Sequence, residues 1–255
     1  MRKSLTLAAK LSSMSKSQGH CQSFLRNIEK EPASQMLVEE LKQLDLRNLG
    51  ILNVLDPYYF KKEGITKVEI ERTEDYRVVM FCLPKGTKMY LHDHPNMAIY
   101  FQQIFGTMKI RCLDKINEKF QYNEISNDEL LELTSSSKII SAKVSFNQVM
   151  KARASQVILP NRYNCHEMIA LENSCFIDYQ IPGYSAISAS RKISYFEEIK
   201  LQNLPNLSKA DFADNTLDCS NSVPENFTLL KYEGNSTQPP NDFIINEALF
   251  RGVYQ

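Results

Sequence analysis

The sequence lacks several features, and each absence narrows the classes of protein that it can be. Its apolar runs are only a few residues long, well short of the roughly 20 that a membrane-spanning helix needs, so no membrane association is expected. Thirty basic and thirty acidic residues leave no net charge, and without a basic stripe we expect no nucleic-acid partner. The six cysteines form no CxxC pair, which excludes a zinc-ribbon or thioredoxin-like motif and favours a reducing compartment.

Three regions are predicted along the chain. Residues 1–30 form a basic, serine-rich tail whose first acidic residue is Glu29. This tail is either disordered, on a cytoplasmic protein, or a mitochondrial transit peptide. Residues 31–63 form a helical lead-in, because apolar residues recur near helical spacing from Met36 to Leu52. Residues 64–255 then form one domain.

The domain after Gly64 is predicted to be mainly β. Apolar residues there alternate with polar ones, and turn residues separate the runs. Strands are expected near 68–70 and 78–81, at 98–105, 108–113, 139–146, 156–159, 167–171 and 175–181, and on both sides of the prolines at 239 and 240. The polar stretches 126–137 and 185–190 are predicted to be loops. No βαβ alternation or internal repeat is visible, so a sandwich or barrel is expected.

Three of the four histidines are candidate metal ligands. His92 and His94 stand two apart, and such residues of a strand point to the same face, about 6–7 Å from each other. Both imidazoles can therefore converge on one ion, with Asp93 pointing the other way. His166 follows a turn containing Pro160 and offers a third imidazole, whereas His20 lies in the basic tail. An HxH pair by itself is more often ordinary surface or core histidine.

The context of these histidines resembles the two sequence motifs of the cupins, whose fold is a double-stranded β-helix, a jelly-roll-like barrel. Many cupins also carry a ligating glutamate, but Ala98 and Ile99 occupy the corresponding positions here. Segments 91–97, 105–110, 158–166, 176–184 and 248–252 together resemble the plant cysteine oxidase and cysteamine (2-aminoethanethiol) dioxygenase family. The likeness runs from about Ser34 to Tyr254.

The resemblance implies a cupin that holds Fe(2+) through His92, His94 and His166, with O2 as co-substrate and no organic cofactor. It also places Asp178 and Tyr184 beside the thiol. From the residues alone, Asp178 fits a structural carboxylate equally well, and Tyr184 fits a packed aromatic residue.

A further tyrosine, Tyr195, matches a position that cross-links to a cysteine in some members of that family. Ile193 replaces the cysteine here, so this cross-link is excluded.

The expected function is addition of O2 to the sulfur of a small thiol or of a protein N-terminal cysteine, which gives a sulfinate and could serve oxygen sensing. The same three histidines also fit a zinc or manganese hydrolase or isomerase, or a non-enzymatic ligand-binding cupin. We expect a monomer.

Overall fold

The computed structural model describes residues 27–30, 32–43, 57–60, 63–121, 126–136, 138–184, 191–199, 226–235 and 243–249, with the isolated positions 9, 13 and 25. Most of the predicted tail, residues 44–56 of the predicted lead-in and the predicted loop 185–190 lie outside the described residues.

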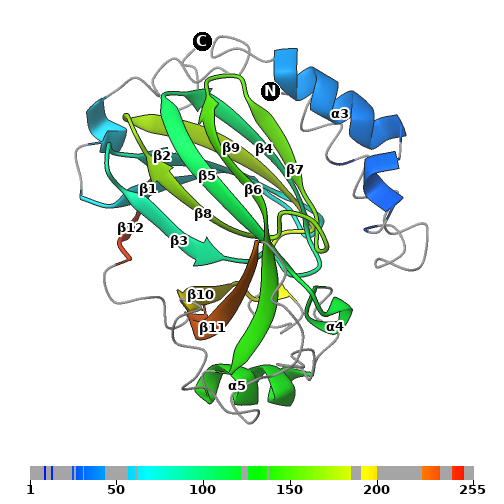
Figure 1. Ribbon diagram of the computed structural model, residues 1–255. Helices are drawn as coiled ribbons and strands as arrows, with labels where there is room; N and C mark the ends of the chain where they lie inside the picture. Colours follow the sequence, from blue (N-terminus) through cyan, green and yellow to red (C-terminus); the bar gives the residue numbers. More distant parts are fainter. Residues whose placement is uncertain are drawn as a thin grey trace.

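Strands of the described chain form two layers (Figure 1). The first layer is a sheet with the order β12-β1-β2-β9-β4-β7, made of β1 (Ile65–Arg72), β2 (Arg77–Leu83), β4 (Ala98–Phe105), β7 (Ser155–Ile158), β9 (Ser174–Ile181) and β12 (Ile245–Leu249). The second layer closes on itself in the order β10-β11-β6-β5-β8-β3, made of β3 (Lys88–His92), β5 (Thr107–Lys115), β6 (Ile139–Lys151), β8 (Cys165–Ala170), β10 (Ser194–Ile199) and β11 (Phe227–Asn235). Neighbouring strands are antiparallel except β1 and β12.

The main core lies between the two layers because alternate residues of their strands face inward. Met108, Ile110 and Met168 from the second layer pack with Phe101 and Phe176 from the first, all nearly inaccessible to solvent. Two antiparallel layers closed around a common core make the double-stranded β-helix of the cupins, so the predicted mainly β class is confirmed. The predicted strands are present, most of them longer than expected.

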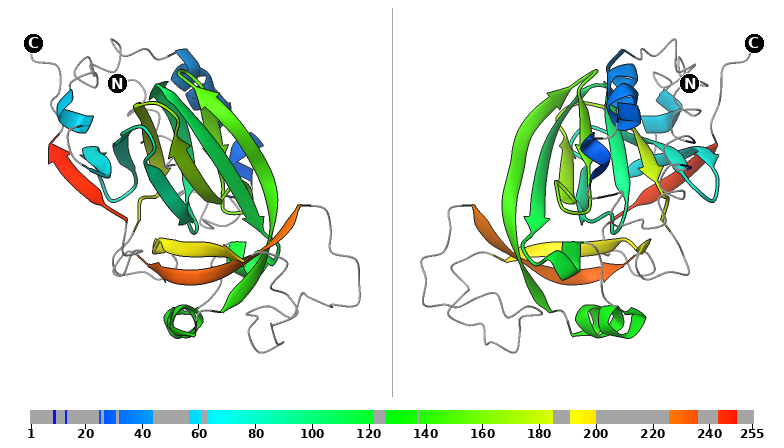
Figure 2. Two further views of the ribbon diagram at one scale, coloured as in Figure 1. Left: turned by 60° about the vertical axis from the view of Figure 1, so that its left-hand side comes forward. Right: turned by 90° about the vertical axis from the view of Figure 1, so that its right-hand side faces the viewer.

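A helical lead-in is also present and covers the outer face of the first layer. Helix α3 (Pro32–Gln43) packs against β4 and β7, preceded by η1 (Ile28–Lys30) and followed by η3 (Pro57–Phe60) (Figure 2). Leu37 is fully buried in this contact, and the hydroxyls of Ser34 and Tyr100 lie 2.6 Å apart. No helix of the described chain is long and apolar enough to cross a membrane.

The prediction of a loop at 126–137 is wrong, because this stretch contains helix α5 (Asn127–Ser135). An ion pair between Lys119 and Glu129 joins it to the short helix α4 (Glu118–Gln121) (Figure 1). Ser126 and Glu129 form a capping box: the Ser126 hydroxyl accepts from the Glu129 amide at 3.2 Å, and the Glu129 carboxylate accepts from the Ser126 amide at 2.7 Å. Polar composition concealed the helix, although the capping pair was visible in the sequence.

One glycine is required where β4 turns into β5. Gly106 has a φ of +77°, a conformation that other residues rarely adopt. A side chain there would also collide with the carbonyl oxygen of Asn173 and the hydroxyl of Ser174. The turn thereby fixes the start of β5, the strand that pairs with the His166-bearing strand β8.

Candidate metal centre

The three predicted ligands meet at one end of the barrel. His92 ends β3 and pairs directly with His166 of β8, while His94 lies two residues beyond the end of β3. All three side chains are buried. One ligating nitrogen from each lies within 4.8 Å of the other two, and within the described chain no other set of three or more His, Cys, Asp or Glu residues comes this close.

Backbone carbonyls fix the rings of His92 and His166. The Nδ1 of His92 lies 2.7 Å from the carbonyl oxygen of Tyr90, and the Nδ1 of His166 lies 3.1 Å from that of Asn164. Because a carbonyl can only accept, each Nδ1 must carry the hydrogen. The lone pair of each Nε2 is therefore left for a metal ion.

A side chain orients the third ring. The Nδ1 of His94 lies 2.6 Å from the Tyr184 hydroxyl, which donates its own hydrogen to the carbonyl of Asp93 at 2.8 Å. The hydroxyl must therefore accept from Nδ1, and Nε2 again keeps its lone pair. This Nε2 is buried and has no hydrogen-bond partner among the described residues, as expected of an atom that binds a metal.

Asn164 ties two of the ligands together. Its side-chain oxygen accepts from the amide of His94 at 2.8 Å, and its side-chain nitrogen donates to the carbonyl of His94 at 3.1 Å. Its own backbone carbonyl holds His166. One buried residue thus positions both the segment after β3 and the ring on β8.

Asp93 points away from the three histidines, as predicted, and forms a buried ion pair. Its Oδ2 lies 2.6 Å from the Nζ of Lys115, and both side chains are at most 2% exposed. Its Oδ1 accepts from the amide of Ser194 at 2.8 Å. Lys115 also donates to the carbonyl of Phe120 at 3.3 Å. The residue between two ligands is therefore fixed to β5 and to β10.

The electrostatics of the cluster suit a metal cation. Burial lowers the pKa of His92, His94 and His166, and the neighbouring rings lower those of His94 and His166 further. The imidazoles are therefore neutral near pH 7, which is the form that binds metals. The three ligating nitrogens lie within 4.8 Å of one another, close enough for movement of the rings to bring all three onto one ion. Imidazole ligands fit iron, zinc, copper or nickel.

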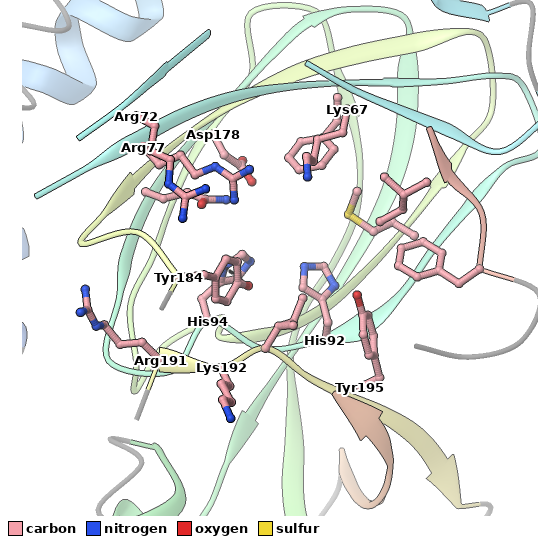
Figure 3. Close-up of a pocket in the computed structure, with 16 residues that line it drawn as sticks. Lys67, Arg72, Arg77, His92, His94, Asp178, Tyr184, Arg191, Lys192 and Tyr195 are labelled. Atoms are coloured by element: carbon pink, nitrogen blue, oxygen red, sulfur yellow. Dashed lines mark hydrogen bonds between the residues drawn. The ribbon is translucent and has the colours of Figure 1, made fainter. Parts of the chain in front are cut away.

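A pocket of about 460 Å³ opens above His92 and His94 (Figure 3). All three of the other predicted site residues, Asp178, Tyr184 and Tyr195, line it. The Tyr195 ring is centred 6.3 Å from that of His92, and burial raises the pKa of its phenol to about 12. Ile193, which stands in place of the cross-linking cysteine, lines the same pocket.

Asp178 lies on β9 and is almost completely buried, at 4% exposure. Burial raises the pKa of its carboxyl to about 8, although a hydrogen bond from Gln180 opposes this shift. Its Oδ1 has no hydrogen-bond partner among the described residues. Asp178 and Gln180 face the pocket while Ile177 and Tyr179 face the opposite core, as the alternation of β9 predicted.

Sequence reasoning missed several residues that shape the site. It did not identify Asn164, although this residue stands two before His166, or the partnership of Asp93 with Lys115. It placed Tyr184 beside the thiol, which stays a prediction, but it did not identify the contact between the hydroxyl of Tyr184 and His94. These pairings join residues far apart in the chain, and single motifs carry no signal for them.

Comparison with known proteins agrees with this geometry. Residues 37–253 match the PCO_ADO family. The chain is 22% identical over 233 residues to plant cysteine oxidase 1 of Arabidopsis thaliana, which covers 88% of this chain and 72% of that protein. It is 27% identical over 128 residues to 2-aminoethanethiol dioxygenase of Mus musculus, covering 47% of this chain and 49% of the mouse protein.

The human 2-aminoethanethiol dioxygenase is 24% identical over 156 residues, covering 58% of each chain. The chain therefore spans only about half the length of these mammalian relatives. Among solved structures, KdgF from Halomonas sp. is similar, with a TM-score of 0.32, 16% identity, and coverage of 48% of this chain and 82% of that one. The family match spans most of the chain and includes every residue of the candidate centre, so the chain belongs to the PCO_ADO family.

Proposed function

We propose that this chain is a non-haem Fe(II) dioxygenase that adds both atoms of O2 to the sulfur of an N-terminal cysteine or of cysteamine. The thiol and O2 give a sulfinate and one proton, so the reaction balances without another reductant. The observation that carries the proposal is a set of three buried, neutral imidazoles beneath a pocket, in a member of this family.

A set of three histidine ligands leaves coordination positions of a redox metal open for substrates. No carboxylate of the described chain joins the three imidazoles, so a divalent ion here keeps its full charge. Acidification of the thiol and activation of O2 are the chemistry that an iron ion would supply when bound. His92, His94 and His166 would hold it through Nε2.

Residues of the pocket wall suit a substrate that carries an amine beside its sulfur. Asp178 offers a buried oxygen without a partner among the described residues, and an ammonium group would supply one. Such a cation would also lower the raised pKa of Asp178 and stabilise the carboxylate. Tyr184 would keep His94 in the ligating tautomer, and Tyr195 would shape the wall near His92.

The decisive experiment is mass spectrometry of thiols incubated with protein that has been loaded with Fe(II) under anaerobic conditions and then exposed to ¹⁸O2. Cysteamine and a short peptide that begins with cysteine are tested in parallel. We expect two ¹⁸O atoms on the sulfur of one or both substrates. No gain on either thiol, with iron bound, would refute the dioxygenase and favour a non-enzymatic ligand-binding cupin.

Two controls separate this function from the use of another metal. The zinc-loaded protein should leave both thiols unchanged, because zinc does not change its oxidation state. The His166→Ala protein should lose bound iron and turnover together. Full iron content in His166→Ala would remove this residue from the centre.

We further propose a cytoplasmic monomer that acts on a small thiol or a protein N-terminus. Four buried cysteines are free thiols, which fits a reducing compartment. If protein N-termini are the substrate, the extent of oxidation would follow the O2 concentration, and the chain would serve as an oxygen sensor.

A further inference from the structure

The pocket above the histidines is strongly basic. Five cationic side chains line it, against the single carboxyl of Asp178. They stand around the mouth rather than at the histidines (Figure 3), and they are Lys67, Arg72, Arg77, Arg191 and Lys192. Asp178 offsets little of this charge near neutral pH, since burial keeps its pKa near 8.

The cations on the β1 and β2 side have acidic neighbours. Lys67 lies 2.6 Å from Glu247, and Arg77 lies 2.6 Å from Glu69. Arg72 lies 3.9 Å from the same oxygen of Glu69. Two carboxylates, those of Glu69 and Glu247, therefore neutralise two of these three cations, and one positive charge remains on this wall.

On the opposite wall, the cations have no acidic neighbour within the described chain. Arg191 donates to the carbonyl of Gly183 at 3.2 Å, and no described carboxylate lies within 4.0 Å of it or of Lys192. Both residues come just before β10, whose Tyr195 pairs with His92. They are the charges of the mouth that are most available to a ligand.

The size of the pocket indicates how an anion would reach these charges. A volume of about 460 Å³ lies in the range that accommodates ligands much larger than cysteamine. The cations are spread around the pocket, with Lys67, Arg72 and Arg77 on one side of the histidines and Arg191 and Lys192 on the other (Figure 3). A chain that leaves the centre through the mouth passes between them.

We propose that the substrate is a peptide with an N-terminal cysteine followed by acidic residues, and that Arg191 and Lys192 recognise those residues. The inference rests on the proposed function and specifies its substrate class. Opposite charges at the mouth of a cleft raise the rate of productive encounter, and salt weakens the effect.

The test compares three decapeptides that begin with Cys-Gly and continue with acidic, neutral amide or basic residues, each with the Fe(II)-loaded enzyme. We expect kcat/KM to be on the order of 10-fold higher for the acidic than for the basic peptide, mainly through KM, and the difference to shrink in 1 M NaCl. The Arg191→Gln/Lys192→Gln variant should lose most of the preference. Lys109→Gln, which removes an exposed lysine outside the pocket, should retain it.

Equal kcat/KM for the three peptides would overturn the inference while leaving the dioxygenase intact. A preference for 3-mercaptopropionate over cysteamine without any charge order among the peptides would also overturn it, because the anion would then belong to a small thiol. Anaerobic binding of the same peptides, measured by fluorescence anisotropy, tests recognition separately from turnover. If no thiol is oxidised but the acidic peptide binds at least 10-fold more tightly than the basic one, the proposed function fails and recognition stands.

Discussion

Replacing Lys115 by Met should strongly lower the free energy of unfolding, although Lys115 is not one of the three candidate metal ligands. Methionine keeps most of the length of the side chain but removes the cation 2.6 Å from Asp93, where both side chains are at most 2% exposed. Removing one partner of a buried pair leaves an uncompensated charge and typically costs about 3–5 kcal/mol. The contact of Nζ with the face of Phe196, at 5.1 Å from the ring centre, is lost as well.

This loss would be a large part of the total stability, which is about 5–15 kcal/mol for most domains. Because the sequence has no tryptophan, far-UV circular dichroism in urea is the suitable probe. We expect the free energy of unfolding to fall by about 3–5 kcal/mol in Lys115→Met. The double variant Asp93→Asn/Lys115→Met should recover much of it, since the buried charge is then gone as well.

A matched control is available at the surface. Lys119 and Glu129 lie at the same 2.6 Å, but their side chains are 45% and 46% exposed, so Lys119→Met should have little effect on stability. A loss below about 1 kcal/mol in Lys115→Met, or a double variant no more stable than the single one, would show that the pair does not carry the expected energy. If Lys115→Met fails to fold, the double variant still tests the reasoning.

Three further perturbations test the site itself. In metal-free protein, the folded Asp178 carboxyl, with its pKa raised to about 8, keeps its proton at pH values where the unfolded one has released it. The free energy of unfolding of the wild type should therefore fall by up to about 1.4 kcal/mol per pH unit between pH 4 and 8, measured by urea titration, and Asp178→Asn should remove this dependence. Tyr184→Phe should weaken metal binding about 10–100-fold in chelator competition with unchanged circular dichroism, because Nδ1 of His94 loses its acceptor; unchanged affinity would make this contact incidental. Chelation should lower the melting temperature of the iron-loaded wild type but not that of His166→Ala, and equal shifts in both would place the metal elsewhere.

The sequence predicted the strands well because their signal is local. A strand-like run rich in apolar residues places β4 at 98–105, and alternation of side chains predicts the faces of β9, both without any tertiary information. Helix α5 was missed because its sequence is polar and its one strong signal, the pair Ser126 and Glu129, describes only the start of a helix.

The candidate ligands could likewise be predicted, because the HxH spacing and a second short motif identify His92, His94 and His166, although His94 lies just beyond the strand on which the spacing argument placed it. The residues that hold these ligands in place could not be predicted from the sequence. Lys115 is 22 residues from Asp93 in the chain, and Asn164 is 70 residues from His94. Only the pairing of β5, β8 and the segment after β3 brings them together, and that pairing is a property of the whole barrel.

The hydrogen bond from His94 to Tyr184 has a thermodynamic consequence. Two ligands are oriented by the main chain, but the third depends on a side chain that also lines the substrate pocket. A ligand in the pocket that contacts Tyr184 therefore acts on the orientation of a metal-binding ring. By linkage, any factor by which such a ligand tightens metal binding is also the factor by which the metal tightens binding of that ligand.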